Sequence, residues 1–217
     1  MTSFQNLLVL GATGQTGQHF TRLALDAGHR VRALARTPDK LRVQHDRLEV
    51  VQGSITDRLD LDGLLDGVDA VVAMIGDRQA QEHRLVNTEF VRELVPAMRR
   101  QGVHRFVYQA GGLSGAPGRP LALPLRIVRA TVARAYLGQH RDNEAVMRYL
   151  DTEARDLQWS VHRAGIGSDG PSKGTLQRSR HWISIGTFVD CAEYTLRMLD
   201  DPSSVHTSDG SAYRRAR

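Results

Sequence analysis

The sequence of 217 residues contains one cysteine, Cys191, and can therefore form no internal disulfide bond. A chain without disulfides is typical of the reducing cytoplasm, and we expect Cys191 to be an inert side chain packed in a helix. No apolar run approaches the roughly 18 residues that a membrane-spanning helix needs. The first residues, MTSFQN, lack the charged and apolar regions of a secretory signal. Together these absences predict a cytoplasmic protein with no membrane span.

Acidic residues are missing from one long stretch of the chain. The formal net charge is +5, and five arginines but no aspartate or glutamate lie from Arg119 to Arg141. No helix-turn-helix, RNP-type or zinc pattern accompanies this excess, so we expect no nucleic-acid partner. A dimer interface and a peripheral membrane contact stay as alternatives for the stretch, and a homo-oligomer is compatible with it. The histidines show no metal-ligand spacing, so no metal site is predicted.

Short apolar runs alternate with longer amphipathic stretches along most of the chain. The strand-like runs are 6–10, 30–35, 48–53, 69–75, 105–109 and 158–163. The helical patterns are at about 15–27, 57–65, 82–100, 121–136, 139–149 and 186–199. Nearly continuous apolar strands that alternate with helices are typical of a parallel sheet covered on both faces. The sequence therefore predicts an α/β fold with a doubly wound parallel sheet of the Rossmann type.

The regular alternation ends after residue 110. GGLSGAPGRP (111–120) reads as a loop, because glycine and proline interrupt regular structure. Apolar residues then recur at helical spacing and form one stripe, which consists of Leu121, Leu125, Val128, Val132 and Tyr136. We interpret residues 111–157 and 164–185 as a small helical and loop lobe over the carboxyl edge of the sheet. The chain 1–217 would then be a single domain.

The stretch LLVLGATGQTGQHF (7–20) places three glycines between a strand and a helix. In such a unit the first glycine permits a tight turn, the second lets an anionic group approach the backbone, and the third lets helix and strand pack closely. Gly11, Gly14 and Gly17 fit these roles, and the helix that follows offers unpaired N–H groups to a pyrophosphate. The polar residues expected to donate beside them are Thr13, Gln15 and Thr16.

The end of the second strand discriminates between dinucleotides. Proteins that bind NAD or FAD usually carry an acidic residue there, which accepts hydrogen bonds from the ribose hydroxyls. This chain has Arg36 at that position, followed by Thr37 and Lys40. A guanidinium suits a 2′-phosphate through paired, charge-assisted hydrogen bonds. Arg36 therefore favours NADP(H) over NAD(H), and the alternative is a solvated arginine after a strand.

Six stretches carry a resemblance to a known family. They are VLGATGQTG, RALART, VVQGSITD, DAVVAMIG, HRFVYQAGG and LQWSVHRAGIGSDGPSKG, from Leu7 to about Leu199. In this order and spacing the chain resembles the atypical short-chain dehydrogenases/reductases. Within them it is similar to the NmrA-like NAD(P)H-binding group, which includes flavin reductases of the biliverdin reductase B type.

The resemblance implies where NADP(H) lies. Residues after the third strand would flank the adenine, residues after the fourth would line the ribose, an arginine would lie near the phosphates, and residues at the end of the fifth strand would lie beside the nicotinamide. In that order they are Ser54 and Ile55; Met74, Ile75 and Gly76; Arg78; and Gln109, Ala110 and Gly111. The family usually has Arg-Pro at the end of the sixth strand, so Arg163 is expected to brace the active-site loop.

The chain departs from the family where catalysis is expected. Relatives commonly have serine or threonine at the end of the fifth strand, where this chain reads YQAGG, and many have Y-x-x-x-K on the next helix. The nearest match is Tyr136 and His140, four residues apart, and a histidine can titrate near neutral pH. Gly138 between them could end one helix and begin another, and Tyr136 belongs to the apolar stripe, so core packing is favoured for it. Ser114, three residues past the usual serine, is the third catalytic candidate.

A poor general acid does not prevent hydride transfer. Hydride passes directly to an acceptor stacked on the nicotinamide, and a flavin or quinone can take its proton from water. We therefore interpret the protein as an NADPH-dependent oxidoreductase whose small-molecule partner is a planar, flavin- or quinone-like acceptor. One alternative is a non-catalytic NADP(H)-binding redox sensor of the NmrA type, which the missing serine and Y-x-x-x-K favour. Another is an isomerase or epimerase with a tightly held cofactor.

Overall fold

The strands of the described residues form one sheet, and the computed structural model describes residues 4–131, 133–180 and 182–214. The strands are β1 (Asn6–Leu10), β2 (Arg30–Ala35), β3 (Leu48–Gln52), β4 (Ala70–Ala73), β5 (Arg105–Gly111), β6 (Gln158–Ser168), β7 (Leu176–Ser179), β8 (Ile185–Thr187) and β9 (Thr207–Tyr213). Their order is β3-β2-β1-β4-β5-β6-β9-β7, with β8 paired to β6. Within this described sheet only β7 runs antiparallel to its partner. The predicted doubly wound parallel sheet is confirmed.

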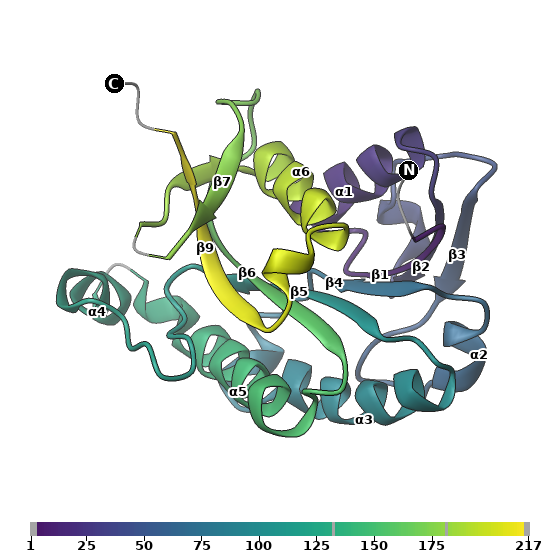
Figure 1. Cartoon of the computed structure of the whole chain (residues 1–217), viewed down its shortest axis with the longest axis horizontal. Coiled ribbons are helices and arrows are strands. Elements are labelled where there is room, and N and C mark those ends of the chain that lie inside the picture. Colours follow the sequence, from purple (N-terminus) through teal and green to yellow (C-terminus); the bar gives the residue numbers. More distant parts are fainter. Residues whose placement is uncertain (1–3, 132, 181, 215–217) are drawn as a thin grey trace.

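Helices cover both faces of the sheet (Figure 1). The α-helices are α1 (Gln15–Asp26), α2 (Leu61–Leu65), α3 (Val86–Arg100), α4 (Leu123–Ala130), α5 (Leu137–Glu153) and α6 (Phe188–Leu199), and the 3₁₀ helices are η1 (Pro38–Lys40), η2 (Ala80–Glu82), η3 (Arg134–Tyr136) and η4 (Pro202–Ser204). α1 and α6 pack together on one face, and α2, α3 and α5 pack on the other. α4 lies at one end of the molecule, away from both layers (Figure 1).

Strand β1 marks the point where the strand order reverses. Leu10, at its carboxyl end, pairs with Leu34 of β2 on one side and with Ala73 of β4 on the other. The connections that leave β1 and β4 therefore diverge to opposite halves of the sheet. In open α/β sheets the crevice at such a reversal is where ligands bind. This places the glycine-rich turn between β1 and α1 at the crevice.

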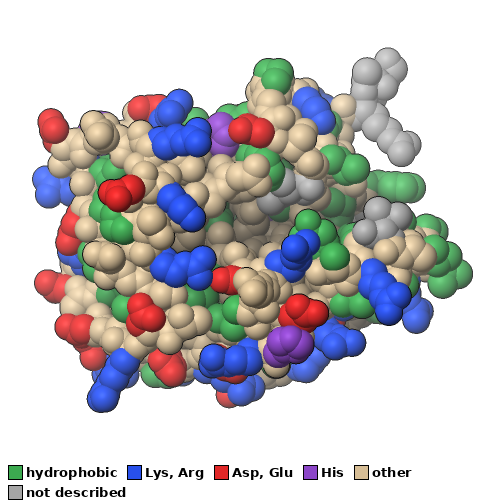
Figure 2. All heavy atoms as spheres, turned by 180° about the vertical axis from the view of Figure 1, so that it is seen from behind, with side chains coloured by type: hydrophobic (Ala, Val, Ile, Leu, Met, Phe, Trp, Pro, Cys, Tyr) green, Lys and Arg blue, Asp and Glu red, His purple; other side chains and the backbone are tan. Residues whose placement is uncertain are grey.

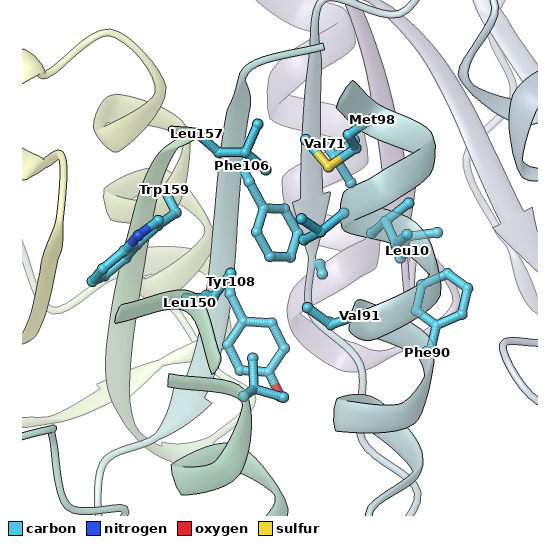
Figure 3. Packing of buried hydrophobic residues seen from close by; sticks show 14 of the residues in the cluster. Leu10, Val71, Phe90, Val91, Met98, Phe106, Tyr108, Leu150, Leu157 and Trp159 are labelled. Atoms are coloured by element: carbon cyan, nitrogen blue, oxygen red, sulfur yellow. The ribbon is translucent and has the colours of Figure 1, made fainter. Parts of the chain in front are cut away.

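Alternate side chains of the central strands fill two separate cores. Phe106 and Tyr108 project from β5 into the core beside Val91 and Met98 of α3 (Figure 3). Val107, between them, points into the opposite core that α1 and α6 cover. Each large apolar side chain buried in this way stabilises the fold by about 1.5–3 kcal/mol. The two filled faces leave the strand ends as the place where ligands can enter.

Several element boundaries differ from the predictions. α2 begins at Leu61, capped by Asp60, whose carboxylate accepts a hydrogen bond from the Gly63 amide at 3.0 Å. α3 begins at Val86 rather than near residue 82, because 80–82 form the 3₁₀ helix η2. None of the described helices is both long and apolar enough to cross a membrane.

The segments predicted as a helical and loop lobe fold differently. The apolar stripe from Leu121 does not form one packed helix: α4 ends at Ala130, and Leu123 and Ile127 are 67% and 57% exposed. Val132 lies outside the described residues. Residues 164–185 contain the end of β6, strand β7 and the first residue of β8, so strands rather than helices extend this edge of the sheet.

Candidate active site

The glycine turn between β1 and α1 is packed too tightly for side chains. Gly11 has φ +85°, and a β-carbon on it would lie 2.4 Å from the carbonyl oxygen of Met74. A β-carbon on Gly17 would lie 2.0 Å from the carbonyl oxygen of Gly11. The Gly14 amide donates to that same carbonyl oxygen at 3.0 Å, which closes the turn. The turn thus needs glycine at its first and third positions for steric reasons.

The amino end of α1 is open. Its cap residue is Gly14, which has no side chain to accept the first amide protons, and the first turn contains no acidic residue. Gly14 and Gln15 are exposed, and Thr13 is half-buried. Thr16 is buried instead, and its hydroxyl accepts a hydrogen bond from the Gln109 side-chain amide at 3.5 Å. An exposed helix start with unpaired amides is suited to a phosphate group.

Arg36 lies at the end of β2, beside this turn. Its Nη1 donates to Oδ2 of Asp77 at 3.0 Å, so the side chain has a protein partner, and its recognition of a 2′-phosphate stays a prediction. The Ala80 amide and Arg36 lower the pKa of Asp77, which therefore stays ionised. The Arg36 side chain is 71% exposed, so most of its donors remain accessible to a ligand. Seen from behind, the molecule is hollowed near the centre, with Lys and Arg side chains beside the hollow (Figure 2).

The other predicted cofactor residues lie on the loops that leave the same strand ends. After β3 the Ser54 amide donates to Asp57 at 2.9 Å, and Ile55 packs against the core. After β4, Ile75 is buried, and a β-carbon on Gly76 would lie 2.6 Å from the side-chain amide of Gln139 on α5. The structure thus brings these loops to one edge of the sheet. Their contacts with a cofactor stay predictions.

Arg78 and Tyr136 contact each other rather than the core. The guanidinium of Arg78 lies 5.6 Å from the centre of the Tyr136 ring, a cation–π contact. Tyr136 is 45% exposed, so the expectation that it packs in the core is wrong. The helix α5 begins only at Leu137, and Gly138 lies inside its first turn against the Gln81 carbonyl, where a β-carbon would come within 2.1 Å. Because α4 ends at Ala130 and Tyr136 belongs to the separate 3₁₀ helix η3, Tyr136 does not continue the apolar stripe of α4.

Ser114 and His140 form a buried pair at the end of β5. The Ser114 hydroxyl and His140 Nδ1 are 3.1 Å apart, with side chains that are 0% and 6% exposed. A turn in which the Ser114 amide donates to the Gly111 carbonyl brings the hydroxyl back toward the strand end. A β-carbon on Gly111 would lie 3.2 Å from His140 Cε1. Two of the three catalytic candidates therefore meet beside the strand end predicted to hold the nicotinamide.

His140 is uncharged at neutral pH. Burial and the nearby Arg129 guanidinium lower its pKa to about 4, and Glu144 opposes them weakly. Among the described residues no hydrogen bond reaches Nε2 of His140. With Ser114 as donor to Nδ1, the ring carries its proton on Nε2 and can donate a hydrogen bond from there. The pair is therefore a neutral hydrogen-bond donor and a weak acid.

A polar network behind this pair fixes its position, and sequence reasoning missed it. Tyr108 donates to Asn143 Oδ1 at 2.6 Å and accepts from the Asn87 side chain at 2.8 Å. Asn143 Nδ2 reaches the Ser114 hydroxyl at 3.5 Å. The neighbouring Asp142 is buried and accepts two backbone amides from the start of α3. The run DNE on α5 was the available signal, because buried polar residues need partners.

The remaining residues at the ends of β5 and β6 have different surroundings. Gln109 bridges the two helices of one face, because its side chain contacts Thr16 of α1 and Thr195 of α6. Ala110 is buried in the opposite core. The Arg163 side chain makes no hydrogen bond or ion pair with any described residue, so the predicted bracing of a loop through such bonds is not found. Cys191 is buried in α6, and burial raises its pKa to about 12, which confirms an inert thiol.

The fold and the glycine turn define a nucleotide-binding protein of the Rossmann class. The chain belongs to the NAD(P)H-binding family, whose model matches residues 11–202. The described residues contain no group of three or more His, Cys, Asp or Glu side chains placed to hold a metal ion.

Known proteins similar to this chain are dehydrogenases and reductases. It is 33% identical over 132 residues to 3 beta-hydroxysteroid dehydrogenase/Delta 5→4-isomerase of Mycobacterium tuberculosis, covering 56% of this chain and 35% of that protein. It is 48% identical over 71 residues to (4-alkanoyl-5-oxo-2,5-dihydrofuran-3-yl)methyl phosphate reductase of Streptomyces griseus, covering 33% of this chain and 25% of that one. The chain thus spans about a third or less of these relatives.

The fold matches solved structures over almost its whole length. A short-chain dehydrogenase/reductase of Veillonella parvula in complex with NADP superposes with a TM-score of 0.73 at 17% identity. The match covers 98% of this chain and 96% of that chain. At this identity the likeness shows the shared fold.

Proposed function

We propose that the protein is an NADPH-dependent oxidoreductase that transfers a hydride to a small planar acceptor of the flavin or quinone kind. The observation that carries the proposal is the uncharged Ser114–His140 pair at the carboxyl end of β5, in a chain of the NAD(P)H-binding family. The reductase among its relatives supports the reaction type.

The choice of NADPH depends on Arg36. Its guanidinium is held by Asp77 beside the glycine turn and keeps most of its donors exposed. A fork of N–H donors at the end of β2 fits a 2′-phosphate, whereas NAD-binding proteins have an acidic residue there. The adenine, ribose and nicotinamide would then be held in turn by the residue groups predicted from the family resemblance.

The choice of acceptor depends on how weak an acid the site offers. When bound, NADPH supplies a hydride, which carries two electrons to the acceptor. His140 is neutral, and the hydrogen bond from its Nε2 can stabilise negative charge on the reduced acceptor without giving up the proton. A reduced flavin or quinone spreads that charge and takes its proton from solvent. A simple ketone gives a strongly basic alkoxide and needs a better acid.

Steady-state oxidation of NADPH tests the proposal. We expect purified protein to oxidise NADPH with flavins and quinones and to be slow with simple ketones and aldehydes. Replacing His140 with glutamine should lower kcat about tenfold, the value of one lost hydrogen bond. His104→Gln, at the exposed amino end of β5, is the matched control. Fast turnover of carbonyls with none of flavins or quinones contradicts the proposal.

The NmrA-type redox sensor remains the second candidate. The missing Y-x-x-x-K pattern favours it, because no tyrosine and lysine lie four residues apart on the described helix α5. A sensor binds NADP⁺ and NADPH without net turnover, and its partner responds to which form is bound. An isomerase or epimerase with a tightly held cofactor would convert its substrate with no net loss of NADPH. Net oxidation that continues over many turnovers excludes both.

A further inference from the structure

Arg163, in the middle of β6 and beside the carboxyl end of β5, has a buried guanidinium without a partner. Its side chain belongs to a residue that is 9% exposed, and its Nε is fully enclosed with no hydrogen-bond acceptor. No described residue forms a hydrogen bond or an ion pair with its side-chain nitrogens. A buried charge is costly unless it is paired, so an arginine in this state needs another reason to be there.

The carboxylates nearest to Arg163 are already engaged by other arginines. Arg119 donates to Asp209 Oδ1 at 2.8 Å, and Arg129 forms an ion pair with Glu144. Burial lowers the pKa of Arg163, and the like charge of Arg119 lowers it further, whereas Asp209 and Glu144 raise it. A guanidinium nevertheless keeps its proton in a protein. The protein itself therefore leaves a positive charge here without a counter-charge in contact.

The position of Arg163 joins it to the proposed reaction site. In the sheet it pairs with Ala110 of β5, and the next pair along is Gly111 with Ala164. Gly111 is the residue against which His140 packs. A cavity of about 910 Å³ opens at the same end of the molecule between the loop after β5, α4 and α5. Its lining includes Arg119 and Glu144, two of the three residues whose charges act on Arg163.

We propose that Arg163 anchors an acidic group of the acceptor, a phosphate or a carboxylate, beside the carboxyl end of β5. This inference rests on the proposed function, because it names the class of acceptor that the same site takes. A guanidinium binds such groups with two parallel N–H···O bonds, and a counter-charge in contact would offset the cost of burying it. Arg119, already turned to this end of the sheet, adds positive charge to the same region. The apolar part of the acceptor would lie against the cavity wall formed by residues such as Leu121, Ile127 and Leu137.

Two acceptors that differ only in one phosphate test the inference. FMN carries a phosphate that riboflavin lacks, and both have the same ring. For the unmodified protein we expect a KM at least about tenfold lower for FMN than for riboflavin, because a hydrogen-bonded charge pair is worth that factor or more. In Arg163→Met this ratio should fall to near one, because the KM for FMN rises toward that for riboflavin. Arg92→Met, on the exposed face of α3, is the matched control and should keep the ratio.

The source of the acidic group is decided by a second pair of probes. A naphthoquinone that bears a carboxylate is compared with the same naphthoquinone without it, in the unmodified protein and in Arg163→Met. A preference confined to FMN indicates a phosphate site, and a preference in both pairs indicates a general anion site. Equal KM values within both pairs in the unmodified protein overturn the inference, while the proposed function stands.

Direct binding separates this inference from the proposed function. Flavin fluorescence is titrated with NADP⁺-loaded protein, so that no turnover is needed. If no acceptor is reduced but FMN binds more tightly than riboflavin in an Arg163-dependent way, the anion site stands and the proposed reaction fails. If Arg163→Met weakens NADPH binding instead and leaves the FMN to riboflavin ratio unchanged, Arg163 serves the cofactor and the inference is wrong.

Discussion

Two buried arginines on the neighbouring strands β5 and β6 have opposite surroundings. Arg105, at the amino end of β5, is 2% exposed and donates to buried oxygens from all three guanidinium nitrogens. Its acceptors are the carbonyls of Gln158, Met198 and Leu199 and the hydroxyls of Ser160 and Ser204. Arg163, in the middle of β6, is almost as deeply buried, and its side chain has no acceptor among the described residues.

The difference separates an arginine that holds the fold from one that is available for a ligand. Arg105 ties β5 to β6 and to the end of α6, and its charge is solvated by oxygens that have few other partners. Arg163 lies at the edge where the loops of a doubly wound sheet leave a crevice, which is where such folds place their ligands. An arginine therefore stabilises the fold at the amino end of β5, and in our proposal another arginine, on β6, recognises a ligand.

The largest expected effect follows from removing the satisfied arginine. Arg105→Met leaves at least three buried carbonyls and two hydroxyls without their donor, and each such group costs about 1–3 kcal/mol when it finds no new partner. With partial repair by water, we expect the free energy of unfolding to fall by about 3–5 kcal/mol. Urea-induced unfolding followed by circular dichroism measures it. A loss below about 1 kcal/mol would mean that Arg105 is not a structural anchor.

A second test concerns His140, a nearby buried side chain that is uncharged at neutral pH. The pKa of His140 is about 4 in the folded protein and 6.5 in its ordinary state. Above pH 6.5 both states are neutral, and between pH 6.5 and 4 only the unfolded state binds the proton. Stability is therefore fully present above pH 6.5 and falls as the pH is lowered to 4, by roughly 2–3 kcal/mol from this residue.

The variant His140→Gln isolates that contribution. The pKa of His162 is lowered to about 3 by burial, so the unmodified protein also loses stability through His162 in the same range. The difference in slope between the unmodified protein and His140→Gln, measured by urea unfolding from pH 7 to 4, belongs to His140 alone. Parallel slopes would show that His140 has the same pKa in the folded and unfolded protein, so that burial does not keep it neutral in the acidic range.

A third arginine, Arg36, stands between the two extremes, because it has one partner and an exposed head group. If it recognises the 2′-phosphate, Arg36→Ala should weaken NADPH binding by about ten- to a hundredfold and leave NADH binding unchanged. Isothermal titration calorimetry with both nucleotides measures this, and NADH is the internal control. An equal loss for both would assign Arg36 to the loop that Asp77 organises rather than to cofactor choice.

The sequence predicted those features of the fold and of the site that depend on the periodic spacing of apolar residues and glycines. The first six strands, the turn at Gly11 and the position of Arg36 follow from apolar runs and glycine spacing. Strands β7 and β9, read as LQRS and TSDGSAY, are polar and give no such signal. The Ser114–His140 pair could not be predicted as a contact, because it depends on a turn that folds Ser114 back onto Gly111.

Arg163 was misread for a related reason. Its predicted place at the end of the sixth strand was wrong, because β6 continues to Ser168. Whether a buried arginine has partners also depends on which carboxylates the fold brings near it. Asp209 follows it by 46 positions on a strand that carried no signal, and Arg119 pairs with that carboxylate from a loop. The sequence can therefore indicate the strand on which a charged residue lies. The tertiary contacts decide whether that charge has a partner.

The smallest expected effect is also the sharpest test of the contrast with Arg105. Arg163→Met removes a buried charge that has no bonded partner and keeps most of the side-chain volume, so the ligand-free protein should be unchanged or more stable by up to about 1 kcal/mol. The same urea unfolding used for Arg105→Met measures it, with no anion in the buffer. Saturating FMN should raise the midpoint of the unmodified protein more than that of Arg163→Met, because a ligand stabilises only the state that binds it. If the ligand-free variant lost about 2 kcal/mol or more in the free energy of unfolding, Arg163 would be a structural residue like Arg105, and the distinction between the two arginines would be wrong.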